Sequence, residues 1–319
     1  MRPWSLLALA ACSEFNIIPP PDFDIVPHEL IPPSVVRSET FTQTTAPKVD
    51  VLFVVDNSSS MTEEATKLSV NFPKFLDYFL YSGLDWHVGV VSTNMEAPGH
   101  SGQLLAANGY SFIDTETVEP DAVFAAMVPY YPGVSHSESG RAAVYAALEV
   151  LVDGVNVGFL RDEAPLHIVI ISDENDHSVS PPKDEFIDWL DDLRPDPATR
   201  SFSAITGLEI CANSSEVGQE YIDVSNVIGG VLWSICTDDW APVMDELGEN
   251  ASTLSTEFFL AEIPLIETIE VILTEPGSLP SSMAEGDDWT YNEVRNSITF
   301  ASLVPSPLAT VEILYETRR

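Results

Sequence analysis

The feature of the sequence that most constrains its fold is an apolar run that stops abruptly in a string of polar residues. The run V-L-F-V-V occupies 51–55, and D-N-S-S-S-M follows it at 56–61. A continuous run of β-branched and aromatic residues predicts a strand buried on both faces, as in the parallel sheets of α/β proteins. Ligands of such sheets gather outside the carboxyl ends of the strands. The sequence therefore predicts a binding site at Asp56, Ser58 and Ser60.

These three side chains supply one carboxylate and two hydroxyls. A hard cation accepts such oxygen ligands and keeps waters in its remaining positions, where an external carboxylate can enter. We expect one divalent cation, Mg²⁺ in the first place, with Mn²⁺ or Ca²⁺ as alternatives. The alternative to a metal site is a polar turn that only caps the following helix.

Further apolar runs alternate with helical patterns along the chain. Strands are predicted at 49–55, 86–92, 166–172 and 201–206. Helices are predicted at 63–81, 140–152, 183–193 and 240–247. This alternation predicts an α/β fold in which a central, mostly parallel sheet is flanked by helices. After about residue 264 the apolar period changes to two, which predicts a small C-terminal β appendage.

The N-terminal residues have the features of a short export signal. Arg2 precedes an apolar run, and small residues stand directly before Cys12. The segment 9–12 resembles the lipobox of bacterial lipoproteins, in which the cysteine is lipidated, and an ordinary signal peptide or a buried strand is the alternative. We expect a lipoprotein signal peptide over 1–11. Residues 12–47 are rich in proline and predict a tether, or else an extended arm packed along the domain.

Net charge limits the classes of binding partner, and cysteine usage indicates the redox compartment. Thirteen basic and fifty acidic residues give a formal net charge of -37, which repels phosphate backbones and excludes nucleic acid as a partner class. Besides Cys12, the chain has Cys211 and Cys236, an even pair that suits an oxidising compartment. We expect a disulfide between them, with two buried thiols as the alternative.

The D-x-S-x-S pattern between a buried strand and a helix resembles the metal-ion-dependent adhesion site of the von Willebrand factor type A (VWA) family. The resemblance implies a Rossmann-like VWA domain over 48–262 and leaves the β appendage to 263–319. It also implies a hydroxyl from a second loop, where Ser137 stands in place of the family's threonine and Glu138 is the alternative ligand. A further aspartate is implied at the end of the central strand, and I-V-I-I-S-D places Asp173 there.

An acidic run follows that last aspartate. Its pattern S-D-E-x-D-x-S, with Glu174 and Asp176, is similar to that of bacterial VWA lipoproteins. These two residues and Glu138 are candidate ligands of an additional ion, calcium by preference, and a solvated acidic turn is the alternative.

The resemblance implies an exported, lipid-anchored protein of the bacterial cell envelope, with the lipid as its only membrane contact. It would capture a protein ligand, through an acidic side chain of that ligand, at the cation. The alternatives are an envelope protein with a purely structural metal and a metal-dependent hydrolase, for which His136 and His177 are the candidate bases. The sequence has no G-x-x-x-x-G-K, H-E-x-x-H or G-x-S-x-G motif, so we expect no enzymatic activity.

Overall fold

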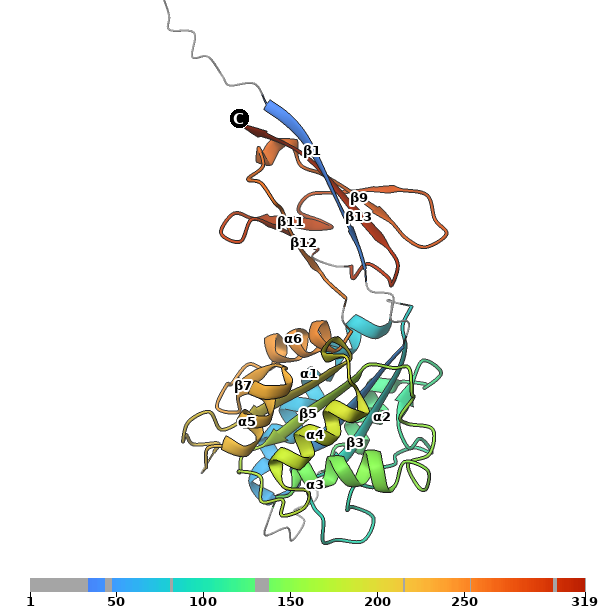
Figure 1. The fold of residues 1–319 in the computed structure, drawn as a ribbon, viewed down its shortest axis with the longest axis vertical. Helices are drawn as coiled ribbons and strands as arrows, with labels where there is room; N and C mark the ends of the chain where they lie inside the picture. The colour runs from blue at the N-terminus through green and yellow to red at the C-terminus, as the bar shows by residue number, and fades with distance from the viewer. Residues whose placement is uncertain are drawn as a thin grey trace, which may run out of the picture.

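The computed structural model describes residues 34–43, 48–80, 83–129, 138–214, 216–252, 254–300 and 303–318. Figure 1 shows two parts along the long axis, one with helices around a sheet and one that is all β. In the described segments no helix is both long and apolar enough to cross a membrane. The predicted signal peptide and Cys12 lie outside the described residues.

A six-stranded sheet forms the centre of the α/β part, in the order β4-β3-β2-β5-β6-β7. Its strands are β2 (Lys48–Val55), β3 (Asp85–Ser92), β4 (Ile113–Asp114), β5 (Leu166–Ser172), β6 (Arg200–Thr206) and β7 (Leu232–Ser234). All neighbours pair in parallel except β3 and β4. From the central pair β2 and β5 the chain builds the sheet outward in both directions, which is the strand order of doubly wound, Rossmann-like folds. The predicted fold class is confirmed.

Helices cover both faces of this sheet (Figure 1). They are α1 (Thr62–Leu80), α2 (Pro120–Met127), α3 (Gly140–Tyr145) with a π-helical turn at Ala146–Val150, α4 (Lys183–Leu193), α5 (Gln219–Ile228) and α6 (Ala241–Ser252). Short 3-10 turns occupy Ser59–Met61, Pro197–Thr199 and Ile266–Thr268. One core joins the sheet to α1, α2 and α6, and a second core joins it to α3, α4 and α5. Strand β2 contributes Phe53 to the first core and Leu52 to the second, which explains its continuous apolar sequence.

Helix α1 is fixed to β2 by a stripe of aromatic side chains. Leu68, Phe72, Phe75 and Phe79 recur at helical spacing and are fully or almost fully buried. The ring of Phe53 meets Phe72 and Phe75 edge-on, with centroids 6.0 and 5.2 Å apart. The loop that connects β2 to α1 is therefore held at both ends by the core.

The all-β part consists of two antiparallel sheets. The first has the order β1-β13-β9-β10, and the second has the order β11-β12-β8. The strands are β1 (Ser34–Thr42), β8 (Glu257–Phe259), β9 (Glu270–Thr274), β10 (Ser281–Met283), β11 (Trp289–Asn292), β12 (Ser297–Phe300) and β13 (Thr310–Arg318). Alternate residues of β13 are buried in a separate core, as the period-two pattern predicted.

Two boundaries differ from the prediction. The expected tether over 12–47 is wrong for residues 34–42, because β1 pairs along its whole length with β13. Strand β1 is mostly exposed and lacks apolar alternation. Its sequence therefore does not indicate a strand, and the pairing depends on β13. The all-β part also begins before residue 263, because β8 pairs with β12.

The predicted disulfide is confirmed between Cys211 and Cys236. Cys211 lies in the loop after β6, and Cys236 follows β7. The bond therefore links two neighbouring loops at the carboxyl edge of the sheet.

We predict that replacing both cysteines with serine lowers the free energy of unfolding by about 3 kcal/mol, because the cross-link restricts the unfolded chain. The bond joins residues 25 positions apart in the sequence. Urea denaturation of the double variant measures the change. An unchanged midpoint at an unchanged m-value would contradict the expectation.

Candidate metal-binding site

The predicted site residues lie where neighbouring parallel strands end. Asp56 follows β2, and Asp173 follows β5, its neighbour in the sheet. Strand β3 pairs with β2 on the other side and is followed by Thr93. The chain departs in opposite directions from β2 and β5, and this switch point is where open α/β sheets bind their ligands.

Asp56 is fully buried and organises the loop after β2. Its Oδ1 accepts a hydrogen bond from the Ser58 amide at 2.7 Å, and its Oδ2 accepts one from Ser172 Oγ at 2.7 Å. Ser58 is partly exposed and Ser60 is exposed, and their hydroxyl oxygens lie 2.9 Å apart. A buried carboxylate is thus joined to a pair of hydroxyls that solvent can reach.

Asp173 faces the same loop. Its side chain accepts a hydrogen bond from Ser60, while Oδ1 is buried and has no hydrogen-bond partner among the described residues. An unpaired buried carboxylate oxygen is unfavourable, so it marks a place where a further group is expected.

The second loop brings a third acid to the site. Glu138 is 1% exposed and accepts a hydrogen bond from Thr93 Oγ1. Ser137 lies outside the described residues, so its role as a ligand stays a prediction. Thr93 was not predicted from the sequence. A signal was present, because S-T-N at 92–94 comes at the end of an apolar strand, as D-N-S does at 56–58.

Burial and neighbouring negative charges oppose the ionisation of Asp56 and Asp173. Burial, followed by the charge of Glu138, raises the pKa of Asp56 from 3.8 to about 7. Burial, followed by the charge of Asp56, raises the pKa of Asp173 from 3.8 to about 6, with a smaller contribution from Glu64. Neither shift has a basic side chain among its causes. A cation is therefore the group that would stabilise the ionised cluster at neutral pH.

The donor set fits a hard divalent cation, which prefers carboxylate and hydroxyl oxygens. In the part of the chain that the structure describes, no three His, Cys, Asp or Glu side chains form a metal-binding group by themselves. A cation here would depend on the hydroxyls of Ser58 and Ser60 as well as on the acids. That mixed composition is the one predicted from the sequence.

Asp176 and Glu174 lie in different surroundings. The Asp176 carboxylate is 3.3 Å from Arg141 Nε and accepts a hydrogen bond from Ser178 Oγ at 2.7 Å. Asp176 therefore has a cationic partner without any additional ion. Glu174 is partly exposed, and burial, followed by the charge of Asp173, raises its pKa. Its role as a ligand stays a prediction.

The disulfide-closed loop borders the site. Ser214 Oγ donates a hydrogen bond to the carbonyl oxygen of Asp173 at 3.0 Å. Asn213 Nδ2 donates another to Glu64 Oε1, on α1, at 2.7 Å. The loop thus ties the end of β5 to the helix that follows the serines.

Comparisons with known proteins found similarity among solved structures alone. No protein-family model and no curated protein matches the sequence. The pilus adhesin SpaC from Lactobacillus rhamnosus GG, in its open conformation, is similar at 10% identity and a TM-score of 0.45, over 90% of this chain and 41% of that chain. A von Willebrand factor type A structure from Catenulispora acidiphila is similar at 11% identity and a TM-score of 0.39, over 90% of this chain and 66% of that chain.

Proximal thread matrix protein 1 from the mussel byssus is also similar, at 10% identity and a TM-score of 0.41, over 70% of this chain and 52% of that chain. This chain spans less than two thirds of the length of each of these three structures. At such identities the likeness concerns the fold alone. The strand order is that of a Rossmann-like fold, and the D-x-S-x-S loop that resembles the VWA family lies at its switch point.

We predict that the metal-free protein loses stability as the pH rises from near 3.8 to about 7. Both aspartates have raised pKa values, so the folded state holds their protons more tightly than the unfolded state. The resulting stabilisation is complete below the unfolded pKa and is lost as the pH passes the folded values. Urea denaturation in chelator across this range measures the trend, and Asp56→Asn, which keeps the other acids, should flatten it. An equal slope in both proteins would contradict the assignment.

A second prediction separates Asp176 from the candidate site. Asp176→Asn should lower the free energy of unfolding by about 2 kcal/mol, because it weakens a buried ion pair with Arg141. The affinity for Mn²⁺, measured by calorimetric titration, should stay unchanged. A clear loss of Mn²⁺ affinity in the folded variant would assign Asp176 to the metal.

Proposed function

We propose that this protein is an adhesion module that binds a protein ligand through a divalent cation held after β2. The observation that carries the proposal is the pair of accessible hydroxyls of Ser58 and Ser60 beside the buried, unneutralised acids Asp56 and Asp173. Buried acids retain a cation, and exposed hydroxyls leave it reachable from outside.

The side chains have distinct tasks in this proposal. Asp56 fixes the loop by accepting hydrogen bonds from the Ser58 amide and from Ser172. Ser58 and Ser60 present neutral oxygen donors, and Asp173 and Glu138 supply negative charge from the neighbouring strand and loop. When bound, the cation would act as an electrostatic bridge to an oxygen of the ligand.

An acidic side chain of the ligand is the group that best fits this bridge. The chain carries a formal net charge of -37, so an acidic ligand is repelled unless a cation lies between the two surfaces. Binding should therefore depend strictly on the metal. The charge of Glu138 works in the other direction, because each carboxylate added to the cation reduces its attraction for an external one. For that reason a purely structural metal is the second candidate.

Catalysis is not part of the proposal. The side chain of His177 is 43% exposed, and its Nε2 lies 3.8 Å from a Glu216 oxygen, so this imidazole is on the surface. His136 lies outside the described residues. Export, and lipid anchoring through Cys12 at the bacterial cell envelope, complete the proposal on the strength of the sequence alone.

We predict that Asp56→Ala weakens Mn²⁺ binding by at least about tenfold, because it removes the carboxylate that orients the loop. Asp121→Ala is the matched control, since Asp121 is exposed on α2. Calorimetric titration with Mn²⁺ and Mg²⁺ gives the affinities, and circular dichroism checks the fold. If folded Asp56→Ala binds Mn²⁺ as tightly as the control variant, the assignment of the metal site is wrong.

Capture from envelope extracts separates adhesion from a structural metal. With Mg²⁺ present, the wild-type protein and Asp121→Ala should retain a protein that chelator releases, and Asp56→Ala should not. If the metal binds and raises the melting temperature but no protein is retained, the structural role is the correct one.

A further inference from the structure

A pocket of about 800 Å³ lies beside the candidate metal site. It is bounded by the loop that follows β3 and by the last residues of α2, and Asn57 contributes to its wall. Asn57 directly follows Asp56, so the pocket begins one residue away from the metal-binding loop. Its volume is in the usual range for ligand sites and exceeds that of one side chain.

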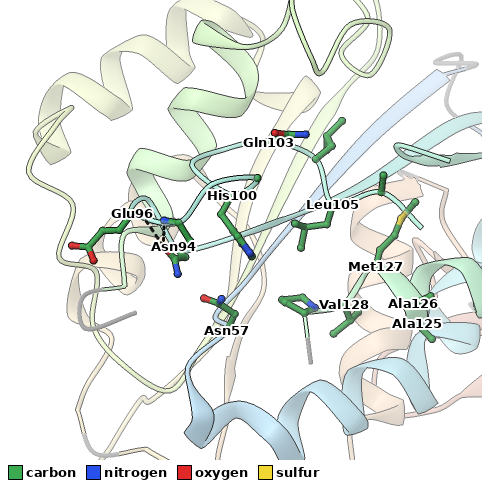
Figure 2. Close-up of a pocket in the computed structure, with 15 residues that line it drawn as sticks. Asn57, Asn94, Glu96, His100, Gln103, Leu105, Ala125, Ala126, Met127 and Val128 are labelled. Carbon is green, nitrogen blue, oxygen red and sulfur yellow. Dashed lines mark hydrogen bonds between the residues drawn. The ribbon is translucent and has the colours of Figure 1, made fainter. Parts of the chain in front are cut away.

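One side of the pocket is apolar. Leu105 comes from the loop after β3, while Ala126, Met127 and Val128 come from the end of α2. Figure 2 shows Met127 and Val128 across the space from His100, and it shows Glu96 pointing away from them. The interior is therefore suited to an uncharged, apolar group.

The other side offers hydrogen-bonding groups. The Asn57 side chain is 3% exposed, and its Oδ1 has no hydrogen-bond partner among the described residues. This oxygen is an acceptor that a ligand N–H can satisfy, and a buried acceptor without a donor is unfavourable. Figure 2 shows Asn57 and His100 facing the same space.

His100 is held in place by its own hydrogen bond. Its Nδ1 lies 2.5 Å from Ser92 Oγ, which fixes the ring and leaves the Nε2 edge for the pocket. Burial lowers the pKa of His100, which favours the neutral form of the ring. The pocket thus places an amide acceptor and an imidazole next to an apolar wall.

We propose that this pocket receives an apolar side chain of the peptide ligand together with the adjoining main-chain amide, next to the acidic residue that reaches the cation. The amide N–H would donate to Asn57 Oδ1, and the side chain would lie against Met127 and Val128. A peptide fits better than a sugar, which would leave the apolar wall unmatched. The link to an acidic residue rests on the proposed function, whereas binding of an apolar amide does not require the metal.

The first experiment tests the pocket alone with N-acetyl-leucine N′-methylamide, followed by NMR on the full chain in Mg²⁺ and in EDTA. Saturable shifts of the Asn57 side-chain amide and the Ala126 methyl are expected in both buffers, and none with N-acetylglycine N′-methylamide. Ala126→Trp should weaken binding by at least about tenfold, because the indole occupies the apolar space. Ala122→Trp is the matched control, exposed on the same helix but away from the pocket. Equal binding of the leucine and glycine probes, or no effect of Ala126→Trp, would overturn the proposal.

The acceptor role of Asn57 has its own variant. Asn57→Leu keeps the volume but removes the acceptor, so the leucine probe should bind more weakly while thermal stability is retained. Undiminished binding to this folded variant would overturn the assignment of the amide contact.

The second experiment joins the pocket to the cation. In Mn²⁺, at least one of Ac-Gly-Asp-Leu-Gly-NH₂ and Ac-Gly-Leu-Asp-Gly-NH₂ should bind about tenfold more tightly than Ac-Gly-Asp-Gly-Gly-NH₂. Ala126→Trp should abolish this advantage without changing the affinity for Mn²⁺. If all three peptides bind equally and chelator releases all three, the pocket proposal fails and the proposed function stands. If the leucine amide binds but no peptide responds to Mn²⁺, the proposed function fails and only the pocket remains.

Discussion

The parallel pairing of β2 with β3 on one side and β5 on the other is the constraint on which the rest of the structure depends. Because β2 is buried on both faces, its register with its neighbours is fixed by two hydrophobic cores. The carboxyl ends of the three strands therefore meet at one edge with little freedom. Polar side chains just beyond those ends lie close together because the strands place them there, and not because they attract one another.

Bringing these acids together is unfavourable, and hydrogen bonds in the loops hold them in place. Asp56 and Asp173 are buried acids with raised pKa values, so in the metal-free protein the site opposes its own ionisation. The hydrogen bonds from Ser172 to Asp56 and from Ser214 to the Asp173 carbonyl hold the two segments in place. Ser214 belongs to the loop that the disulfide closes, so this cross-link stabilises the edge of the sheet as well as the fold.

The sequence predicted those parts of the molecule whose signals are local. Continuous apolar runs and helical stripes were sufficient for the central strands and for α1, α4 and α6, and the end of the first apolar run was sufficient to place Asp56 directly after β2. Strand β1 escaped prediction because its side chains are mostly exposed and its partner β13 lies at the other end of the chain. The contact between Thr93 and Glu138 joins residues 45 positions apart, and only the parallel register places them together. The pocket is assembled from three separate segments, and no single motif encodes it.

Asp56 and Asn57 are adjacent in one short loop and belong to the two different sites proposed above. Asp56 turns toward β5 and bonds to Ser172, whereas Asn57 lines the pocket on the side of β3 and α2. Consecutive residues of an extended chain point to opposite sides, and the loop keeps that divergence as it leaves β2. The proposed cation site and the pocket are consequently neighbours along the backbone that leaves a buried strand. A ligand that uses both must present its acidic and apolar residues close together, so specificity arises from spacing as well as from chemistry.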